Sequence, residues 1–335
     1  MIQNRGMTGA RRRAATILAL GVAIAIVAAG CSSSSSHSAS LPATTTPKTT
    51  PKTTPTAQAA ECEHPHAAGQ FAQSFTFDGV ARTYQLYVPK GYTGNRKVPL
   101  VLNFHGFGSN AVQQMIYGDF RPEADLAEFL IVAPNGQVPA ARHFNLRGEA
   151  GLQNDVDMVG SLISHLEATL CVNPRRVYSA GLSDGGAMTS VLACRMSNRI
   201  AAFATVALVL PCPAGHPVPI VAFNGTADPV VPFNGGTVNC CGGPTIGSAP
   251  AAMASWAKVD HCSLEYRDEL ISSEVTRRLW TGCAMGNAPV FYILNGGGHT
   301  WPGSIPIPRL GKTTKQIDAS ETIWKFFQLH ALATA

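Results

Sequence analysis

The sequence predicts an α/β fold with a mainly parallel central sheet and helices on both faces. Short, almost continuously apolar runs alternate with stretches in which apolar residues recur at helical spacing. This alternation is typical of buried parallel strands covered by helices. Residues 98–104 are the clearest strand and residues 155–170 the clearest helix. Strict alternation at residues 82–88, after a turn at Asp78-Gly79, predicts an exposed antiparallel edge at the N-terminal side.

The other elements follow in chain order. Pro122 begins an expected helix over residues 122–128, and residues 130–133 read as a buried strand. Asp155 is expected to cap the long helix that follows. A strand at residues 176–180 leads into a helix near residues 186–193. Further strands are expected near residues 203–210, 219–224, 275–280 and 290–294, and further helices near residues 250–258 and 319–330.

The first thirty residues have the features of an export signal. Basic residues up to Arg13 precede an apolar run over residues 14–29, which is too short to favour a stable transmembrane span. Small residues then lead to Cys31. This stretch resembles a bacterial lipobox, with Ala28 where leucine is usual, and the resemblance implies that Cys31 is acylated. Simple secretion is the alternative.

Residues 31–60 are rich in Ser, Thr, Pro, Ala and Lys and contain no aromatic residue. Such a segment cannot bury enough apolar surface to offset its chain entropy, so it is expected to be an extended tether before a catalytic domain at residues 61–335. The net charge of +5 comes from the six basic residues before residue 61, which leaves about −1 for the rest. A nearly neutral domain gives no reason to expect nucleic-acid binding.

The chain contains nine cysteines. If Cys31 is acylated, eight remain, and an even number behind an export signal indicates disulfides in an oxidising compartment. Zinc is the alternative, but no C-x-x-C pair occurs. Cys262 and Cys283 are expected to pair, because strand-like stretches between them could bring their ends together. Cys240 and Cys241 are adjacent, so each is expected to pair with a distant cysteine.

A Gly-x-Ser-x-Gly motif at residues 181–185 lies where the strand pattern stops and the helix pattern begins. In this setting the motif is a nucleophile elbow, which exposes Ser183 on a sharp turn above a helix N-terminus. The glycines relieve crowding around the serine. The helix amides then point toward negative charge that develops beside it. Ser183 is therefore the expected nucleophile.

A serine hydroxyl needs a base to remove its proton and an acid to orient that base. Asp228 and His299 follow the strands at residues 219–224 and 290–294, in the order Ser, Asp, His. Asp260 and Asp268 are competing acids, but neither follows a buried strand. The competing histidines lie before the domain, before the elbow or at the end of the last helix: His64, His66, His105 and His330. An ordinary turn residue or loop histidine is the alternative role at each position.

The backbone amides of Asp184 and Phe107 are expected to form the oxyanion hole. Phe107 follows the strand at residues 98–104 within a glycine-rich turn. His105, Trp301 and Pro302 are expected to contact substrate, Trp301 and Pro302 as an apolar wall beside the base. For Trp301, packing of the histidine loop is the alternative.

Four ordered motifs, at residues 105–108, 181–188, 224–232 and 297–303, resemble those of the polyhydroxybutyrate depolymerase and feruloyl esterase group of α/β-hydrolases. The lipobox and tether make the chain most similar within that group to the LpqC-like lipoprotein esterases of actinobacteria. The resemblance covers residues 75–329. Many members have tyrosine where this chain has Phe233, and they vary at the position of Phe107, so the substrate does not follow from the resemblance.

The resemblance implies an extracellular esterase that cuts hydroxyalkanoate, feruloyl or acetyl esters, including polymeric or cell-wall-linked ones. It would be attached to the outer face of the cytoplasmic membrane by its lipid, or secreted. No cofactor or metal and a monomeric state are expected. An exported peptidase of the same fold and a non-catalytic envelope-binding protein are the alternatives.

Overall fold

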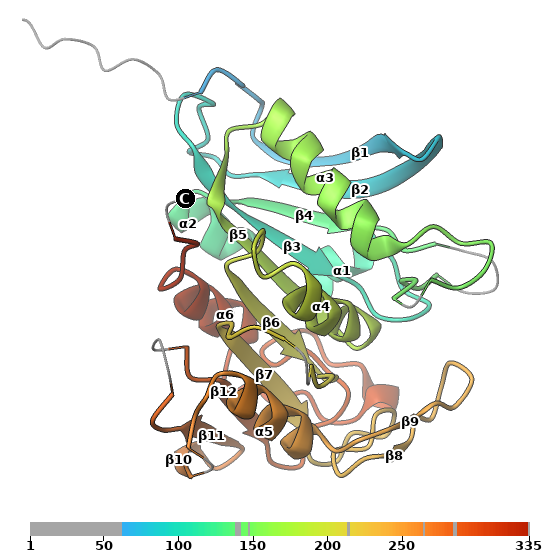
Figure 1. Ribbon diagram of the computed structural model, residues 1–335, viewed down its shortest axis with the longest axis vertical. Helices are drawn as coiled ribbons and strands as arrows, with labels where there is room; N and C mark the ends of the chain where they lie inside the picture. Colours follow the sequence, from blue (N-terminus) through green and yellow to red (C-terminus); the bar gives the residue numbers. More distant parts are fainter. Residues whose placement is uncertain are drawn as a thin grey trace, which may run out of the picture. The chain divides into compact units, whose positions relative to one another are not determined.

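Ten strands form one mixed sheet in the order β1-β2-β4-β3-β5-β6-β7-β12-β11-β10 (Figure 1). The computed structural model describes residues 62–137, 142–146, 148–212, 215–263, 265–283 and 287–333. All of them belong to the unit Ala57–Ala335. The predicted signal sequence, Cys31 and residues 31–60 lie outside the described residues. In the part of the chain described, no helix combines the length and apolar character needed to cross a membrane.

The strands of the large sheet are β1 Gly69–Phe77, β2 Val80–Val88, β3 Val98–Phe104, β4 Leu130–Pro134, β5 Val172–Leu182, β6 Ala202–Val206, β7 Ile220–Gly225, β10 Tyr266–Ser272, β11 Val275–Trp280 and β12 Val290–Leu294. A separate hairpin joins β8 Gly236–Thr237 to β9 Thr245–Ile246. The helices are α1 Ala111–Tyr117, α2 Arg121–Ala127, α3 Asp155–Thr169, α4 Asp184–Arg195, α5 Ala249–Val259 and α6 Ala319–Phe327, with a 3-10 turn η2 at Pro308–Leu310.

The middle of the sheet is parallel from β4 to β12, as the apolar runs predict. Every residue of β3, β4, β6 and β7 is buried, which explains why these strands lack a polar alternation. β1 and β2 form the expected antiparallel edge. A second antiparallel edge, made by β11 and β10, was not expected. Because β10 is mostly exposed and carries charged residues, its sequence lacks an apolar strand signal.

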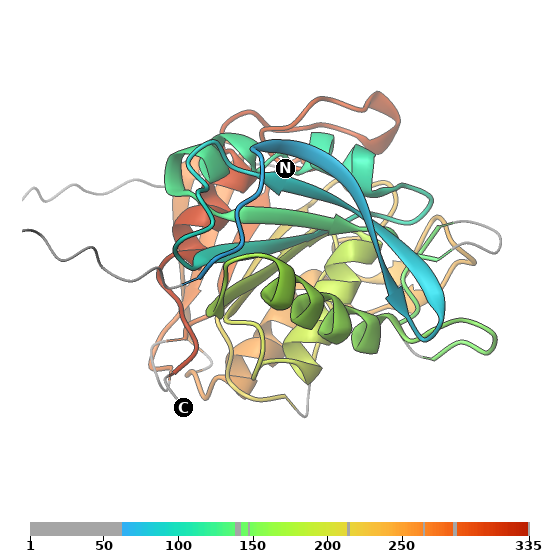
Figure 2. The same ribbon diagram turned by 90° about the horizontal axis from the view of Figure 1, so that it is seen from above.

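The helices cover both faces of this sheet (Figure 2). α3, α4 and α5 contribute to one apolar cluster, and α1, α2 and α6 contribute to the other. α3 begins one residue earlier than the predicted cap at Asp155 implies. Asn154 is the N-cap and accepts the amide of Val156, whereas Asp155 is the first helical residue. Asp155 is instead a buried partner of Arg82 on β2, a role that depends on a contact across 73 residues.

The eight cysteines of the described residues pair as Cys62–Cys171, Cys194–Cys212, Cys240–Cys241 and Cys262–Cys283. The predicted Cys262–Cys283 pair is confirmed, and it ties together the two ends of the β10–β11 hairpin. The prediction for Cys240 and Cys241 is wrong, because these neighbours bond to each other. Cys241 has a φ of 59°, so the chain turns sharply between them.

Asp260, at the end of α5, gives the fold a pH dependence. Its Oδ1 accepts the Val218 amide, and burial raises the pKa of its carboxyl from 3.8 to about 7. A carboxyl with a higher pKa in the folded than in the unfolded protein favours the folded state while it is protonated. Asp260 therefore contributes its full stabilisation of the fold below pH 3.8. This stabilisation is lost as the pH rises through about 7. Asp260 is fully buried, which is why its charged form is disfavoured in the folded protein.

We therefore expect Asp260→Asn to raise the free energy of unfolding at pH 8 by on the order of 2–4 kcal/mol, and to change it little at pH 4. Asparagine keeps an oxygen for the Val218 amide but carries no charge. Urea unfolding of both proteins at the two pH values measures the difference. Equal effects of the substitution at pH 4 and pH 8 would contradict the role assigned to this carboxyl.

Candidate active site

Ser183 lies on a strained turn between β5 and α4. Its φ of 58° and ψ of −116° place it in a region that non-glycine residues rarely adopt. The turn is possible because its flanking glycines approach other backbone closely. A Cβ on Gly181 would lie 2.2 Å from the Gly185 carbonyl oxygen, and one on Gly185 would lie 2.1 Å from the Phe104 carbonyl oxygen. The predicted elbow is thus the local structure of residues 181–185.

Asp228 and His299 come together because β7 and β12 are parallel neighbours in the sheet. Their following loops therefore leave the same sheet edge. His299 Nδ1 lies 2.8 Å from Asp228 Oδ2, and both side chains are almost fully buried, at 6% and 2% exposure. Asp228 Oδ1 accepts the amides of Val230 and Val231, each at 2.8 Å. Both carboxylate oxygens are therefore held, and the aspartate can fix the tautomer and orientation of the imidazole.

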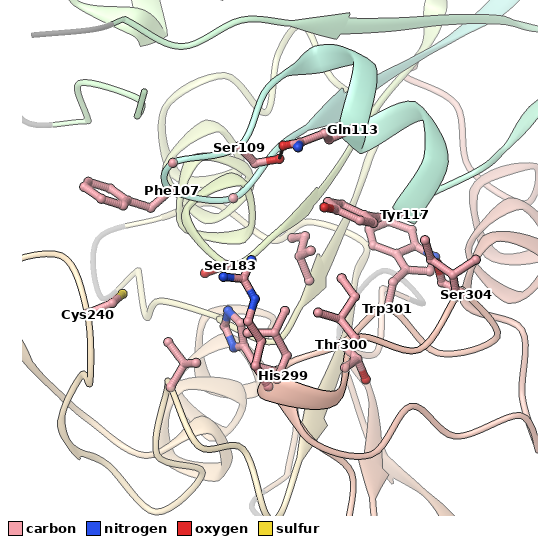
Figure 3. Close-up of a pocket in the computed structure, with 18 of the residues that line it drawn as sticks. Phe107, Ser109, Gln113, Tyr117, Ser183, Cys240, His299, Thr300, Trp301 and Ser304 are labelled. Carbon is pink, nitrogen blue, oxygen red and sulfur yellow. Dashed lines mark hydrogen bonds between the residues drawn. The ribbon is translucent and has the colours of Figure 1, made fainter. Parts of the chain in front are cut away.

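Ser183 and His299 open into one pocket of about 330 Å³. Figure 3 shows their side chains next to each other near its centre. Phe107 and Cys240 lie on one side of Ser183, and Tyr117, Trp301 and Ser304 lie on the other (Figure 3). We call these two sides of the pocket its two compartments. A serine between them suits a substrate whose two parts extend in opposite directions from the reacting carbon.

The loop after β3 passes directly against the nucleophile. A Cβ added to Gly106 would lie 3.4 Å from the Cβ of Ser183 and 3.9 Å from its Oγ. The Gly108 amide donates to the Arg142 carbonyl at 2.8 Å, which holds the end of this loop. Phe107 lies between these two glycines, lines the pocket and is 41% exposed. This loop therefore brings backbone close to the side chain of Ser183.

Asp184 has two separate roles in the geometry. Its amide belongs to the first residue of α4, next to Ser183, where the N–H groups of a helix have no partner within the helix. Its carboxylate turns away and accepts the Phe144 amide at 3.0 Å. Burial raises the pKa of this carboxyl to about 6. The carboxylate thereby attaches the loop around Phe144 to the base of the elbow.

Residues 82–221 match the family model described as Esterase PHB depolymerase. These residues therefore carry a domain that matches the esterase PHB depolymerase family. Feruloyl esterase B of Piromyces equi is 30% identical over 223 residues, which cover 63% of this chain and 41% of that protein. The match therefore spans less than half of the Piromyces enzyme. Feruloyl esterase C of Emericella nidulans is 26% identical over 65% of this chain and 76% of its own length.

Solved structures agree on the fold. An acetyl xylan esterase from Aspergillus awamori superposes with a TM-score of 0.54 at 12% identity, covering 77% of this chain and 99% of that chain. A thermostable esterase superposes with a TM-score of 0.53 at 17% identity, covering 78% of this chain and 63% of that chain. These likenesses show the α/β-hydrolase fold. The family match and the sequence relatives identify a serine carboxylic ester hydrolase.

Two residues predicted to contact substrate in this esterase lie elsewhere. His105 is fully buried and does not line the pocket. Its Nδ1 donates to the Gly106 carbonyl at 2.8 Å and its Nε2 accepts the Gly136 amide at 3.0 Å. Burial lowers the pKa of the imidazole to about 4, which keeps it neutral. His105 therefore joins two loops beneath the pocket. Pro302 is also buried, and its carbonyl accepts the Ala319 amide at the start of α6.

Trp301 lines the pocket and also packs the histidine loop, while its contact with substrate stays a prediction. It lines the pocket of the esterase although it is only 2% exposed. Its indole N–H donates to Ser320 Oγ at 3.1 Å, and its ring packs edge-to-face on Phe120. The tryptophan is thus a fixed apolar wall that also anchors the histidine loop to α6.

Sequence reasoning missed several pocket residues of the esterase. Gln113 and Tyr117 come from α1, a helix that was not expected. Their spacing of four, immediately after the glycine-rich loop, was the available signal. Others come from irregular loops or from the short turn η2, where no periodicity marks them: Val230, Cys240, Cys241, Ile305, Ile307 and Arg309. Within the described ranges, no group of three or more His, Cys, Asp or Glu side chains is placed to hold a metal ion.

Proposed function

We propose that this esterase cuts carboxylic esters through an acyl-enzyme, with Ser183 as nucleophile, His299 as base and Asp228 as the orienting acid. The observation that carries the proposal is the buried His299–Asp228 hydrogen bond of 2.8 Å beside the strained elbow serine. Ser183 and His299 line one pocket, and Asp228 holds the imidazole from a third loop, which is the arrangement that activates a serine.

In the proposed reaction, His299 takes the Ser183 hydroxyl proton as the oxygen attacks the ester carbonyl carbon. The amides of Asp184 and Phe107 stabilise the oxyanion of the tetrahedral intermediate. Collapse of this intermediate breaks the ester C–O bond, and His299 returns the proton to the leaving alkoxide. Water, activated by the same histidine, then releases the acid and restores the serine. Asp228 stays ionised and stabilises the imidazolium that forms.

The proposed substrates are hydroxyalkanoate, feruloyl or acetyl esters, polymeric or linked to the cell wall. The names of the relatives support feruloyl and acetyl groups. The buried Trp301 gives the pocket an apolar wall that suits an acyl or aromatic group. We further propose that the protein is a monomer outside the cytoplasm, anchored by a lipid on Cys31. Its disulfides are in keeping with an oxidising compartment.

Active-site labelling tests the proposal. A fluorophosphonate is expected to modify the purified chain, with disulfides intact, at Ser183 alone, because only an activated serine attacks the phosphorus rapidly. Peptide mapping by mass spectrometry locates the adduct, and His299→Ala is expected to abolish labelling. A folded protein that takes up no label, but binds a wall glycan, would instead support an envelope-binding protein. Faster cleavage of peptide amides than of matched esters would support a peptidase.

A further inference from the structure

The β8–β9 hairpin carries the Cys240–Cys241 disulfide to the wall of the pocket. Both cysteines line the cavity that contains Ser183 and His299. Cys240 is half-buried and Cys241 is exposed. In Figure 3 Cys240 lies on the same side of Ser183 as Phe107. The other three disulfides of the described residues do not line this cavity.

The turn that presents this disulfide has an unusual backbone. Cys241 and Gly242 occupy its central positions with φ values of 59° and 84°, and the Gly243 amide donates to the Cys240 carbonyl at 2.8 Å. Positive φ at both central positions defines a type I′ turn, in which glycine or asparagine is usual at the place of Cys241. A cysteine here costs backbone energy that a glycine would avoid. A bonded side chain at this position therefore suggests a role for the sulfur atoms themselves.

The hairpin is also fixed to the loop that holds the triad acid. The Asn239 amide donates to the Val230 carbonyl at 2.8 Å, and its side-chain Nδ2 donates to the Pro229 carbonyl at 2.8 Å. Val230 lines the pocket, and its own amide donates to Asp228 Oδ1. One residue therefore links the disulfide-bearing turn to the catalytic loop by two hydrogen bonds. These bonds fix the position of the Cys240–Cys241 disulfide relative to Asp228.

We propose that the Cys240–Cys241 disulfide determines substrate specificity, as a rigid apolar wall against the arm of the ester that extends from Ser183 toward Phe107. The bonded sulfurs lack S–H donors and form a polarisable surface that suits aliphatic or aromatic carbon. Phe107 gives the same compartment an aromatic face. The disulfide closes an eight-membered ring with the peptide bond between the two cysteines, and this ring cannot move away as two free thiols can, so the width of this compartment is fixed. The inference rests on the proposed esterase function.

Two ester series measured on the full chain test the inference. One series lengthens the acyl chain from acetyl to hexanoyl on p-nitrophenol, and the other lengthens the alcohol from methanol to hexanol on acetate. In the wild type, kcat/KM is expected to rise in the series whose growing arm meets the disulfide. In Cys240→Ser/Cys241→Ser the ratio of kcat/KM for the longest ester to kcat/KM for the shortest is expected to fall by about 10-fold, because KM for the long esters rises.

Two further variants distinguish an effect of the Cys240–Cys241 disulfide on substrate contact from an effect on folding. Cys240→Ser/Cys241→Gly removes the disulfide but lets residue 241 keep its positive φ, so it is expected to lose the same selectivity. Cys262→Ser/Cys283→Ser removes a disulfide outside the pocket and is expected to keep the selectivity of the wild type. Alkylation of the denatured, unreduced wild type followed by mass spectrometry is expected to find Cys240 and Cys241 unmodified.

Each result bears on the inference. Loss of selectivity in either series supports it and assigns the acyl or the alcohol arm to this compartment. Unchanged selectivity in both series, with p-nitrophenyl acetate still cleaved, overturns the inference and leaves the esterase function intact. Full selectivity in Cys240→Ser/Cys241→Gly, or free thiols at these two positions, also overturns it. A wild type that cleaves no ester rejects the esterase function itself.

Discussion

Replacement of Ser183 with alanine is expected to lower kcat for ester hydrolysis by about 10,000- to 1,000,000-fold and to leave the fold intact. The reason is that no other group in the geometry can form the acyl-enzyme, so only binding and oxyanion stabilisation would remain. Alanine fits the elbow, because the backbone amide of residue 183, which donates to the Val206 carbonyl at 2.8 Å, is unchanged by the substitution. Steady-state hydrolysis of p-nitrophenyl acetate measures the loss.

Ser161→Ala is the matched control for this substitution. Ser161 is exposed on α3 and does not line the active-site pocket, so the same loss of a hydroxyl there is expected to leave kcat unchanged. Circular dichroism and the midpoint of thermal unfolding check that both variants are folded. If a folded Ser183→Ala protein retained more than about a tenth of wild-type turnover, another nucleophile would have to perform the reaction.

Replacement of Arg82 with methionine is expected to lower the free energy of unfolding by about 3–5 kcal/mol. Arg82 and Asp155 are 5% and 0% exposed, and their ion pair joins β2 to the start of α3. Arg82 also donates to the Asn135 carbonyl at 3.2 Å. Without the guanidinium, the Asp155 carboxylate would remain charged inside the protein with only neutral donors. Urea unfolding at pH 7 measures the change.

The Arg82–Asp155 pair also holds the loop that contacts the nucleophile elbow through Asp184. Asp155 Oδ2 accepts the Asn145 amide at 2.7 Å, and the preceding Phe144 amide donates to the Asp184 carboxylate. Loss of Arg82 is therefore expected to loosen the loop that packs under the elbow. The destabilisation should be partly recovered by adding Asp155→Asn, since no unpaired buried charge would then remain.

Lys325→Met provides the comparison for the Arg82 variant. Lys325 pairs with Glu321 on the surface of α6, where both side chains are more than half exposed. Removing one charge from such an exposed pair is expected to change the free energy of unfolding by less than about 0.5 kcal/mol. If Arg82→Met cost no more than Lys325→Met, the buried pair would have no special role in stability.

Local sequence predicted the elements whose signal does not depend on distant partners. The apolar runs at β3 and β4 and the helical spacing in α3 are properties of each segment, so they could be recognised without the fold. The edge position of β10 and the helix α1 could not be recognised in this way. β10 is exposed and charged and exists because β11 pairs with it. α1 has seven residues, too few for a reliable periodic pattern.

The candidate triad could be predicted because its residues follow recognisable strands in a fixed order, and the sheet brings the ends of parallel strands to one edge. The direction of each side chain could not. His105 and Pro302 lie beside pocket residues in the sequence but are buried outside the pocket lining. Backbone groups bond both ring nitrogens of His105, and the Pro302 carbonyl accepts the Ala319 amide. Cys240 and Cys241 bond to each other because a turn with positive φ brings them together, which residue spacing does not reveal.

The α/β pattern, the elbow at Ser183 and the order of the residues proposed to act with it can be predicted from local sequence, because strand periodicity and glycine positions encode them. Three other features follow only from the folded chain: which side chains line the pocket, the pairing of Arg82 with Asp155, and the disulfide that lines the pocket beside the nucleophile. These features arise from contacts between segments far apart in the chain. Their energies depend on burial and on the positions of partners, which no local stretch of sequence contains.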